Sequence, residues 1–182
     1  LLALRCFWGL AASPTSQVYS FWFRGFTRLG GMASKYSVVA TREVKATPGK
    51  VHDLLVNLGR TEEWNPYVEM DPAIKSEMSD QKIGVGAWYS YESKRVGNGR
   101  LEITHVAPTV ITLEIKFFNK GKVDVGQTRY MISPGSSADS VTVTWEMTGD
   151  HAGIRKLMWP IMNGVLTKAF NRGLEKLAAL VE

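Results

Sequence analysis

The chain has 182 residues, of which 45% are hydrophobic and 21% charged, and its formal net charge is +5 at pH 7. This length is enough for one domain with a substantial core, and the composition is ordinary for a globular protein. Residues 1–31 hold three arginines and no acidic residue, which leaves 19 basic and 17 acidic residues in the remainder. Because this remainder is nearly neutral and has no cluster of basic and aromatic residues, a nucleic-acid-binding surface is not expected.

Residues 1–31 differ in character from the rest of the chain, since they contain seven of its 19 aromatic residues. Arg5 interrupts the first apolar run, and Pro14 falls where a membrane span would need about 20 apolar residues. We expect residues 1–32 to be a dispensable or read-through extension, with a membrane-associating or targeting segment as the alternative, and residues 33–182 to form the domain. A chain that starts at Met32 should then melt within about 5 °C of the full chain.

The residues that usually bind metals are sparse and scattered. Cys6 is the only cysteine, and the three histidines, His52, His105 and His151, show none of the short spacings of paired ligands. We therefore expect no metal and no cofactor. The expected location is cytoplasmic, with membrane association through residues 1–31 as the alternative.

The domain is predicted to begin with a strand and two short helices. Alternating, β-branched sequence over 36–45 predicts the strand. Thr47-Pro48 is typical of an N-cap followed by a first helical position, and Gly59 is expected to end this helix. A further helical turn should end at Asn65-Pro66, because the residue before a proline avoids the helical region.

The middle of the chain alternates between apolar and polar residues, which predicts strands joined by tight turns. Gly97-Asn98-Gly99 and Asn119-Lys120-Gly121 are typical hairpin turns, since glycine and asparagine tolerate positive φ. Hairpin connections imply an antiparallel sheet. The predicted strands span residues 74–78, 87–93, 100–106, 111–117, 122–133 and 141–148.

The chain is predicted to finish with one long helix that begins near Pro160, a residue suited to a first helical position. A single helix lying on a curved sheet cannot fill all the space beneath it, so the pattern favours an internal cavity. The apolar stripe of the helix is expected to comprise Ile161, Val165, Ala169, Phe170, Leu174, Leu177 and Val181.

Four segments carry a family resemblance by their order and spacing. They are Trp64-Asn65-Pro66, Tyr89-x-Tyr91 before Gly97-x-Gly99-Arg100, Val141–Trp145 running to Gly149, and Phe170–Leu177. Together they resemble the START-like, Bet v 1-like (SRPBCC) superfamily, most closely its polyketide cyclase/dehydrase-like branch, over nearly all of 35–182. The resemblance implies an α+β helix-grip fold: a seven-stranded antiparallel sheet wrapped around a long C-terminal helix, with two short helices after the first strand and a hydrophobic cavity.

Aromatic and flexible apolar side chains on the inner sheet face and the helix are the best candidates for a ligand site, because they suit an adaptable apolar pocket. The alternative for each is a purely structural role in the core. The candidate ligand-binding residues are Trp64, Tyr67, Tyr89, Tyr91, Leu101, Ile103, Leu113, Ile115, Phe117, Tyr130, Val143, Trp145, Met158, Met162, Leu166 and Phe170.

Two residues are candidates for acid–base chemistry. His105 is expected on the same strand face as Leu101 and Ile103, as a hydrogen-bonded rim histidine or as a general base. Asp124 would face inward if Tyr130 does, and a buried acid would need a partner.

The function that the sequence favours is binding or transport of a small hydrophobic molecule or lipid by a monomer or weak homodimer. A polyketide cyclase or dehydratase that uses His105 or Asp124 is the alternative. An interaction protein with a vestigial cavity is the third hypothesis.

Overall fold

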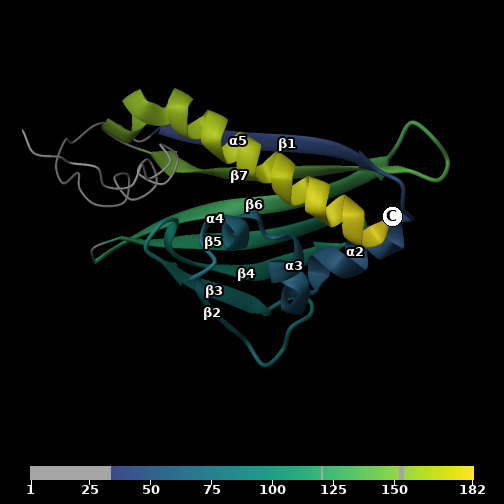
Figure 1. Ribbon diagram of the computed structural model, residues 1–182, viewed down its shortest axis with the longest axis horizontal. Helices are drawn as coiled ribbons and strands as arrows, with labels where there is room; N and C mark the ends of the chain where they lie inside the picture. Colours follow the sequence, from purple (N-terminus) through teal and green to yellow (C-terminus); the bar gives the residue numbers. More distant parts are fainter. Residues whose placement is uncertain (1–33, 120, 152–153) are drawn as a thin grey trace, which may run out of the picture.

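Seven strands in the described part of the chain form one antiparallel sheet, and a long C-terminal helix packs on its inner face (Figure 1). The computed structural model describes residues 34–119, 121–151 and 154–182, without the side chains of 34, 151 and 154–160. The helix-grip α+β fold expected from the sequence is therefore confirmed. The extension proposed for residues 1–32 lies outside the described residues.

The order of strands in the sheet is β1-β7-β6-β5-β4-β3-β2, so the first two strands lie at opposite edges. The chain crosses between these edges through short helices, and the long helix follows the last strand. The strands are β1 (Ser34–Val44), β2 (Lys75–Met78), β3 (Trp88–Ser93), β4 (Gly97–Ala107), β5 (Val110–Asn119), β6 (Lys122–Pro134) and β7 (Val141–His151). The helices are α2 (Pro48–Val56), the 3-10 helix η1 (Leu58–Arg60), α3 (Thr61–Trp64), α4 (Pro66–Met70) and α5 (Ile154–Val181).

The short helices begin as expected but end differently. The Thr47 hydroxyl accepts a hydrogen bond from the Lys50 backbone N–H at 3.4 Å, which confirms the predicted N-cap of α2. Gly59 does not end this helix, because Asn57 caps it earlier and accepts from the Gly59 N–H at 3.0 Å, which begins η1. Asn65 ends α3 but also caps a helix that the sequence did not suggest, α4, by accepting from the Tyr67 N–H at 3.0 Å.

The turn between β3 and β4 lies three residues earlier than predicted, at residues 94–96. The Ser93 hydroxyl accepts hydrogen bonds from the backbone N–H groups of Arg95 and Val96, both at 3.0 Å, and so fixes the turn there. Gly97 has a φ of 86°, which a glycine adopts without strain, and it already pairs with Ser93 across the hairpin.

Helix α5 begins at Ile154, earlier than the expected start near Pro160, and its contact with the sheet is uneven. Phe170, Leu174 and Leu177 in its C-terminal half are at most 1% exposed. Ile161 was expected in the apolar stripe but is 57% exposed. Among the described side chains of α5, those of its C-terminal half therefore make the tightest contact with the sheet.

A close approach of α5 to the sheet occurs at an aromatic stack. The rings of Trp145 and Phe170 are nearly parallel, at 3°, with centroids 4.0 Å apart. Gly173, one turn later on the helix, makes this approach feasible: a Cβ at that position would lie 2.7 Å from the Trp145 ring and 3.1 Å from Pro66. A side chain at residue 173 would thus push the helix away from both.

We expect Gly173→Ala to destabilise the protein although alanine is the better helix former. The propensity gain is about 1 kcal/mol. Overpacking costs about 1–3 kcal/mol, because the Trp145 ring is held by Phe170 and has little room to move.

Gly164→Ala is the matched control, since no described atom outside its own helix turn lies within 4 Å of a Cβ there. It should stabilise by up to about 1 kcal/mol. Urea unfolding measures both changes, and a Gly173→Ala variant as stable as Gly164→Ala would show that the close packing at Trp145 is not limiting.

Candidate ligand-binding cavity

A cavity lies between the inner face of the sheet and the N-terminal half of α5. It offers about 200 Å³ in which the centre of a water molecule can lie, many times the space that one buried water needs. Strand residues that line it are Leu101, Ile115, Phe117, Thr128, Tyr130, Trp145 and Met147. Helix α5 contributes Ile161, Met162, Val165, Leu166 and Phe170. The short helices and the β3–β4 hairpin contribute Thr61, Trp64, Asn65, Tyr67, Tyr91 and Val96.

Four aromatic rings form one side of this wall. Trp64 meets Trp145 and Tyr130 edge-on, with centroid separations of 5.6 and 5.7 Å, and Trp145 stacks on Phe170. Trp64 is only 3% exposed. Such edge-to-face and stacked pairs are the favoured aromatic geometries. Trp64 therefore joins the α3 segment to both the sheet and α5, which makes this wall a fixed part of the core.

Two tyrosines bring hydroxyl groups into the wall. Tyr91 and Tyr130 are 8% and 4% exposed, and neither hydroxyl makes a hydrogen bond to another described residue. The Tyr91 hydroxyl lies directly over Gly99, where a Cβ would be only 2.6 Å away. Burial raises the pKa of both tyrosines well above the usual value of 10, so both remain neutral at physiological pH.

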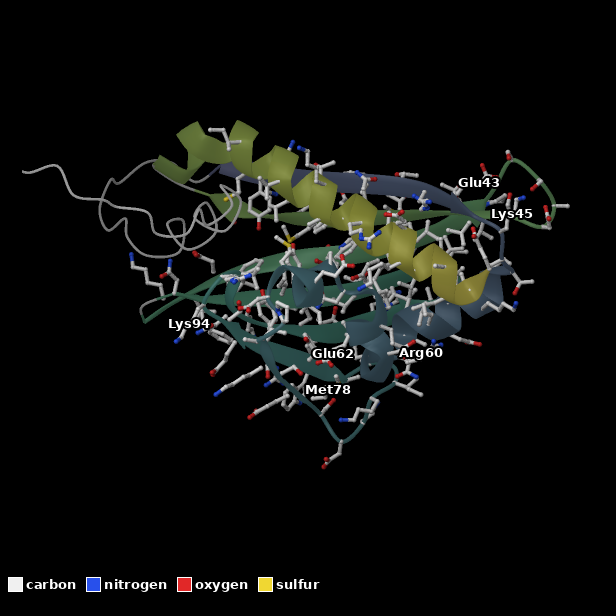
Figure 2. The ribbon with its side chains drawn as sticks, in the orientation of Figure 1. Glu43, Lys45, Arg60, Glu62, Met78 and Lys94 are labelled. Atoms are coloured by element: carbon white, nitrogen blue, oxygen red, sulfur yellow. The ribbon has the colours of Figure 1, made fainter. Side chains whose placement is uncertain are left out.

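The ionisable side chains of the described wall include two acids. They are Asp124 and Asp150, which accompany Tyr36, Asn119 and Val125. No lysine, arginine or histidine is among the described residues that line the cavity. The labelled cations Lys45 and Lys94 lie toward opposite ends of the molecule (Figure 2). The described residues also contain no group of three or more His, Cys, Asp or Glu that could hold a metal ion.

Most of the candidate ligand-binding residues lie in this wall, and their role in binding stays a prediction. Tyr89, Ile103, Leu113 and Val143 face inward but are packed in the core instead. The Tyr89 hydroxyl is buried near α3, and burial together with the negative charge of Glu62 raises the Tyr89 pKa to about 12. The side chain of Met158 lies outside the described residues. The candidates that line the cavity are Trp64, Tyr67, Tyr91, Leu101, Ile115, Phe117, Tyr130, Trp145, Met162, Leu166 and Phe170.

The expected facing of His105 is wrong. A bulge in β4 between Ile103 and His105 shifts the register, so His105 pairs with Thr112 and is exposed on the outer face. An inserted residue reverses the alternation of side chains beyond it. His105 therefore does not line the cavity, whereas Asp124 does, because Tyr130 and Asp124 share the inward-facing set of β6.

Sequence reasoning missed several wall residues for identifiable reasons. Thr61 and Asn65 enter the wall through the α3–α4 junction, whose second helix was not expected. Val96 belongs to a turn that was placed three residues too late. Met147 lies on the same face of β7 as the candidates Val143 and Trp145, but alternation does not locate a residue along the length of a strand and so did not place it in the cavity.

A curved antiparallel sheet that encloses an apolar cavity with one long helix defines a class of helix-grip proteins. Residues 35–182 match the family described as polyketide cyclase / dehydrase and lipid transport, and the chain belongs to this family. No curated protein matches it. None of the described helices is long and apolar enough to cross a membrane.

Solved structures with the same fold come from several organisms. A hypothetical protein from Helicobacter pylori is 13% identical with a TM-score of 0.61, over 81% of this chain and 88% of that chain. Truncated norcoclaurine synthase from Thalictrum flavum is 12% identical with a TM-score of 0.61, over 86% and 98%. A protein from Mesorhizobium loti is 18% identical with a TM-score of 0.58, over 80% and 96%. At these identities the likeness is one of fold.

We expect the free energy of unfolding to fall as the pH rises above about 10. Because the folded-state pKa values of Tyr91 and Tyr130 are raised, their stabilising effect is complete below the unfolded-state value of about 10 and is lost progressively above it. Each such tyrosine contributes a slope of about 1.4 kcal/mol per pH unit.

Urea unfolding between about pH 9 and pH 11.5 measures this slope. Tyr130→Phe removes one ionising group. It should reduce the slope of the free energy of unfolding against pH by about 1.4 kcal/mol per pH unit. If the two proteins show the same pH dependence, the Tyr130 hydroxyl is not buried in the folded state as described.

Proposed function

We propose that the protein binds a small, predominantly apolar molecule in this cavity and carries it without converting it chemically. The observation that supports this most is the cavity itself, about 200 Å³ of space within an apolar wall. Protein interiors are normally packed to the density of organic crystals, and voids are destabilising. A ligand that fills the space would restore the missing contacts and remove its own apolar surface from water, at about 25 cal/mol per Å².

The arrangement of α5 supports the same function. Phe170, Leu174 and Leu177 on the inner face of its C-terminal half are fully buried, while Met162, Val165 and Leu166 over the cavity are only partly buried. Partly buried side chains leave room to adjust to ligands of different shape, and the flexible side chain of Met162 suits such a wall. The family to which the chain belongs includes lipid transport in its description.

A cyclase or dehydratase is the second candidate, and Asp124 is the observation that favours it. This acid lines the cavity, whereas His105 lies on the outer face. Norcoclaurine synthase from Thalictrum flavum, 11% identical, has been solved in complex with dopamine and hydroxybenzaldehyde, so the same fold accommodates small aromatic molecules in another protein. Apart from Asp124 and Asp150, the polar groups in the described wall are hydroxyls, indoles and amides, which favours binding over proton transfer.

Binding of the neutral fluorescent probe N-phenyl-1-naphthylamine tests the proposal. We expect a dissociation constant in the micromolar range, about −8 kcal/mol. Met162→Trp places a larger side chain in the cavity wall and should weaken binding by about tenfold, because the added ring occupies space that the probe needs.

Leu180→Trp is the control for this substitution. Leu180 is on the same helix and 39% exposed, and it is not part of the cavity wall. It should leave probe binding unchanged, and circular dichroism should show both variants folded. Equal affinity of the folded Met162→Trp variant and the wild type would place the probe elsewhere. Consumption of a candidate polyketide by wild type, but not by Asp124→Asn, would replace carriage with catalysis.

A further inference from the structure

The two edges of the sheet, β1 and β2, are protected to different degrees (Figure 1). An edge strand presents unpaired backbone N–H and C=O groups, and proteins usually keep such strands short or interrupt them with a proline or a bulge. Strand β2 has only four residues. Strand β1 has eleven, with no proline or glycine, and it pairs with β7 in one continuous register. Among the described residues no strand pairs with its other side, so β1 is the edge to which a strand can be added.

Helix α5 covers the inner face of β1 and leaves the outer face exposed. On the inner face Val38, Ala40 and Val44 are at most 5% exposed. The alternate residues, which face outward, are all exposed from Lys35 onward, and Val39 at the middle of the strand is 47% exposed. In an antiparallel sheet about half of the backbone groups of an edge strand point away from its neighbour. A partner strand would thus meet both backbone groups and an exposed row of side chains.

The outer face of β1 is complementary to itself. The antiparallel register that pairs all eleven residues with a second copy of β1 places Val39 opposite Val39. In this register Lys35 lies opposite Glu43 of the second copy, and Ser37 lies opposite Thr41, and each pair occurs twice. Opposite charges and hydroxyl groups stabilise an antiparallel pair when they lie directly across from each other. The register of greatest overlap is therefore also one in which the charges match.

From this complementarity we infer that two copies of the chain associate through β1 and join their sheets into one continuous antiparallel sheet. Arg42, the remaining charged residue of β1, lies opposite the uncharged Tyr36, so no like charges meet. The two-fold axis passes beside Val39, perpendicular to the sheet, and both α5 helices lie on the same side. Such an interface uses the same patch on both copies, as in most two-fold dimers. Pairing brings the two exposed Val39 side chains together.

The dimer is expected to be weak and reversible. One edge strand from each copy buries less than the roughly 1,200–2,000 Å² of a stable interface, and exposed charge pairs contribute little. We expect a dissociation constant on the order of 10 μM. Sedimentation velocity of the full chain between about 1 and 200 μM measures it. A chain that stays monomeric over this whole range would overturn the inference.

Val39→Lys tests whether β1 forms the contact. It places two lysines directly opposite each other at the two-fold axis, which should weaken the dimer at least about tenfold. Val123→Lys is the matched control, since Val123 is an outward-facing strand valine that is 53% exposed and lies on β6. It should leave the dissociation constant unchanged. Circular dichroism should show both variants folded, and a dimer equally stable in both would place the contact elsewhere.

An exchange of charges tests the register. Lys35→Glu leaves two acids on the outer face of the strand and Glu43→Lys leaves two lysines, so each variant alone brings like charges together. Each should dimerise about tenfold more weakly than the wild type. In an equimolar mixture every acid again faces a lysine, and the dimer should be recovered. Equal association of the separate variants and the mixture would show that this register is wrong.

A disulfide test does not depend on Glu43, which also accepts hydrogen bonds from the Ser136 N–H and the Ser140 hydroxyl. Cys6, the only cysteine, is first replaced by serine. Val39→Cys then brings two Cα atoms to about 4.5–5.5 Å, within the range of a disulfide. Thr41→Cys is the control, because its two copies are offset by four residues, about 14 Å.

With glutathione disulfide as the oxidant, a covalent dimer should form from Val39→Cys and not from Thr41→Cys. Equal cross-linking of the two variants, or none in Val39→Cys, would overturn the inference. The outcome is separate from that of the proposed function, because Val39 does not line the cavity. Binding of N-phenyl-1-naphthylamine should be the same in Val39→Lys and the wild type, so loss of the dimer and loss of the ligand site can be told apart.

Discussion

The stack of Trp145 on Phe170 determines where the long helix can lie on the sheet. The two rings are 4.0 Å apart and nearly parallel, and the absence of a side chain at Gly173 allows the helix to come this close. Beyond this contact Leu174 and Leu177 are fully buried, whereas Ile161, the first described side chain of α5, is 57% exposed. A helix fixed at one end of a curved sheet leaves unfilled space under its other end, and the cavity lies there.

The same aromatic wall that fixes the helix also sets the chemistry of the cavity. Trp64 and Tyr130 pack against Trp145, so they cannot turn away to find hydrogen-bond partners without disturbing the core. Aromatic residues with a polar atom offer a large apolar surface and one directional group. Since the described wall has no cation, the groups available to a ligand are an apolar surface, neutral hydroxyls and two acids. The residues that pack the core are thus also residues that line the cavity.

Periodicity predicted the sheet, the order of its elements and the inward faces of its strands, because alternation and turn chemistry are local properties. The N-cap at Thr47 could be predicted because it depends only on residues that follow directly in the sequence: its hydroxyl accepts a hydrogen bond from the Lys50 backbone N–H. The bulge that turns His105 outward has no comparable local signal, since it depends on the pairing of β4 with β5. Alternation also could not separate Tyr91, which lines the cavity, from Tyr89, which faces the same way but is packed near α3. Which inward residues border empty space depends on where the helix touches the sheet.

The most direct test of this account is to locate a bound molecule by nuclear magnetic resonance. Intermolecular nuclear Overhauser effects would be measured between N-phenyl-1-naphthylamine and the methyl groups of the full chain. The account predicts contacts to the methyl groups of Met162, Leu166 and Ile115, which line the cavity, and none to those of Leu54 and Leu177, which lie in the packed core. Contacts confined to exposed residues such as Val39 or Ile83, or contacts to Leu177 without any to Met162, would contradict it.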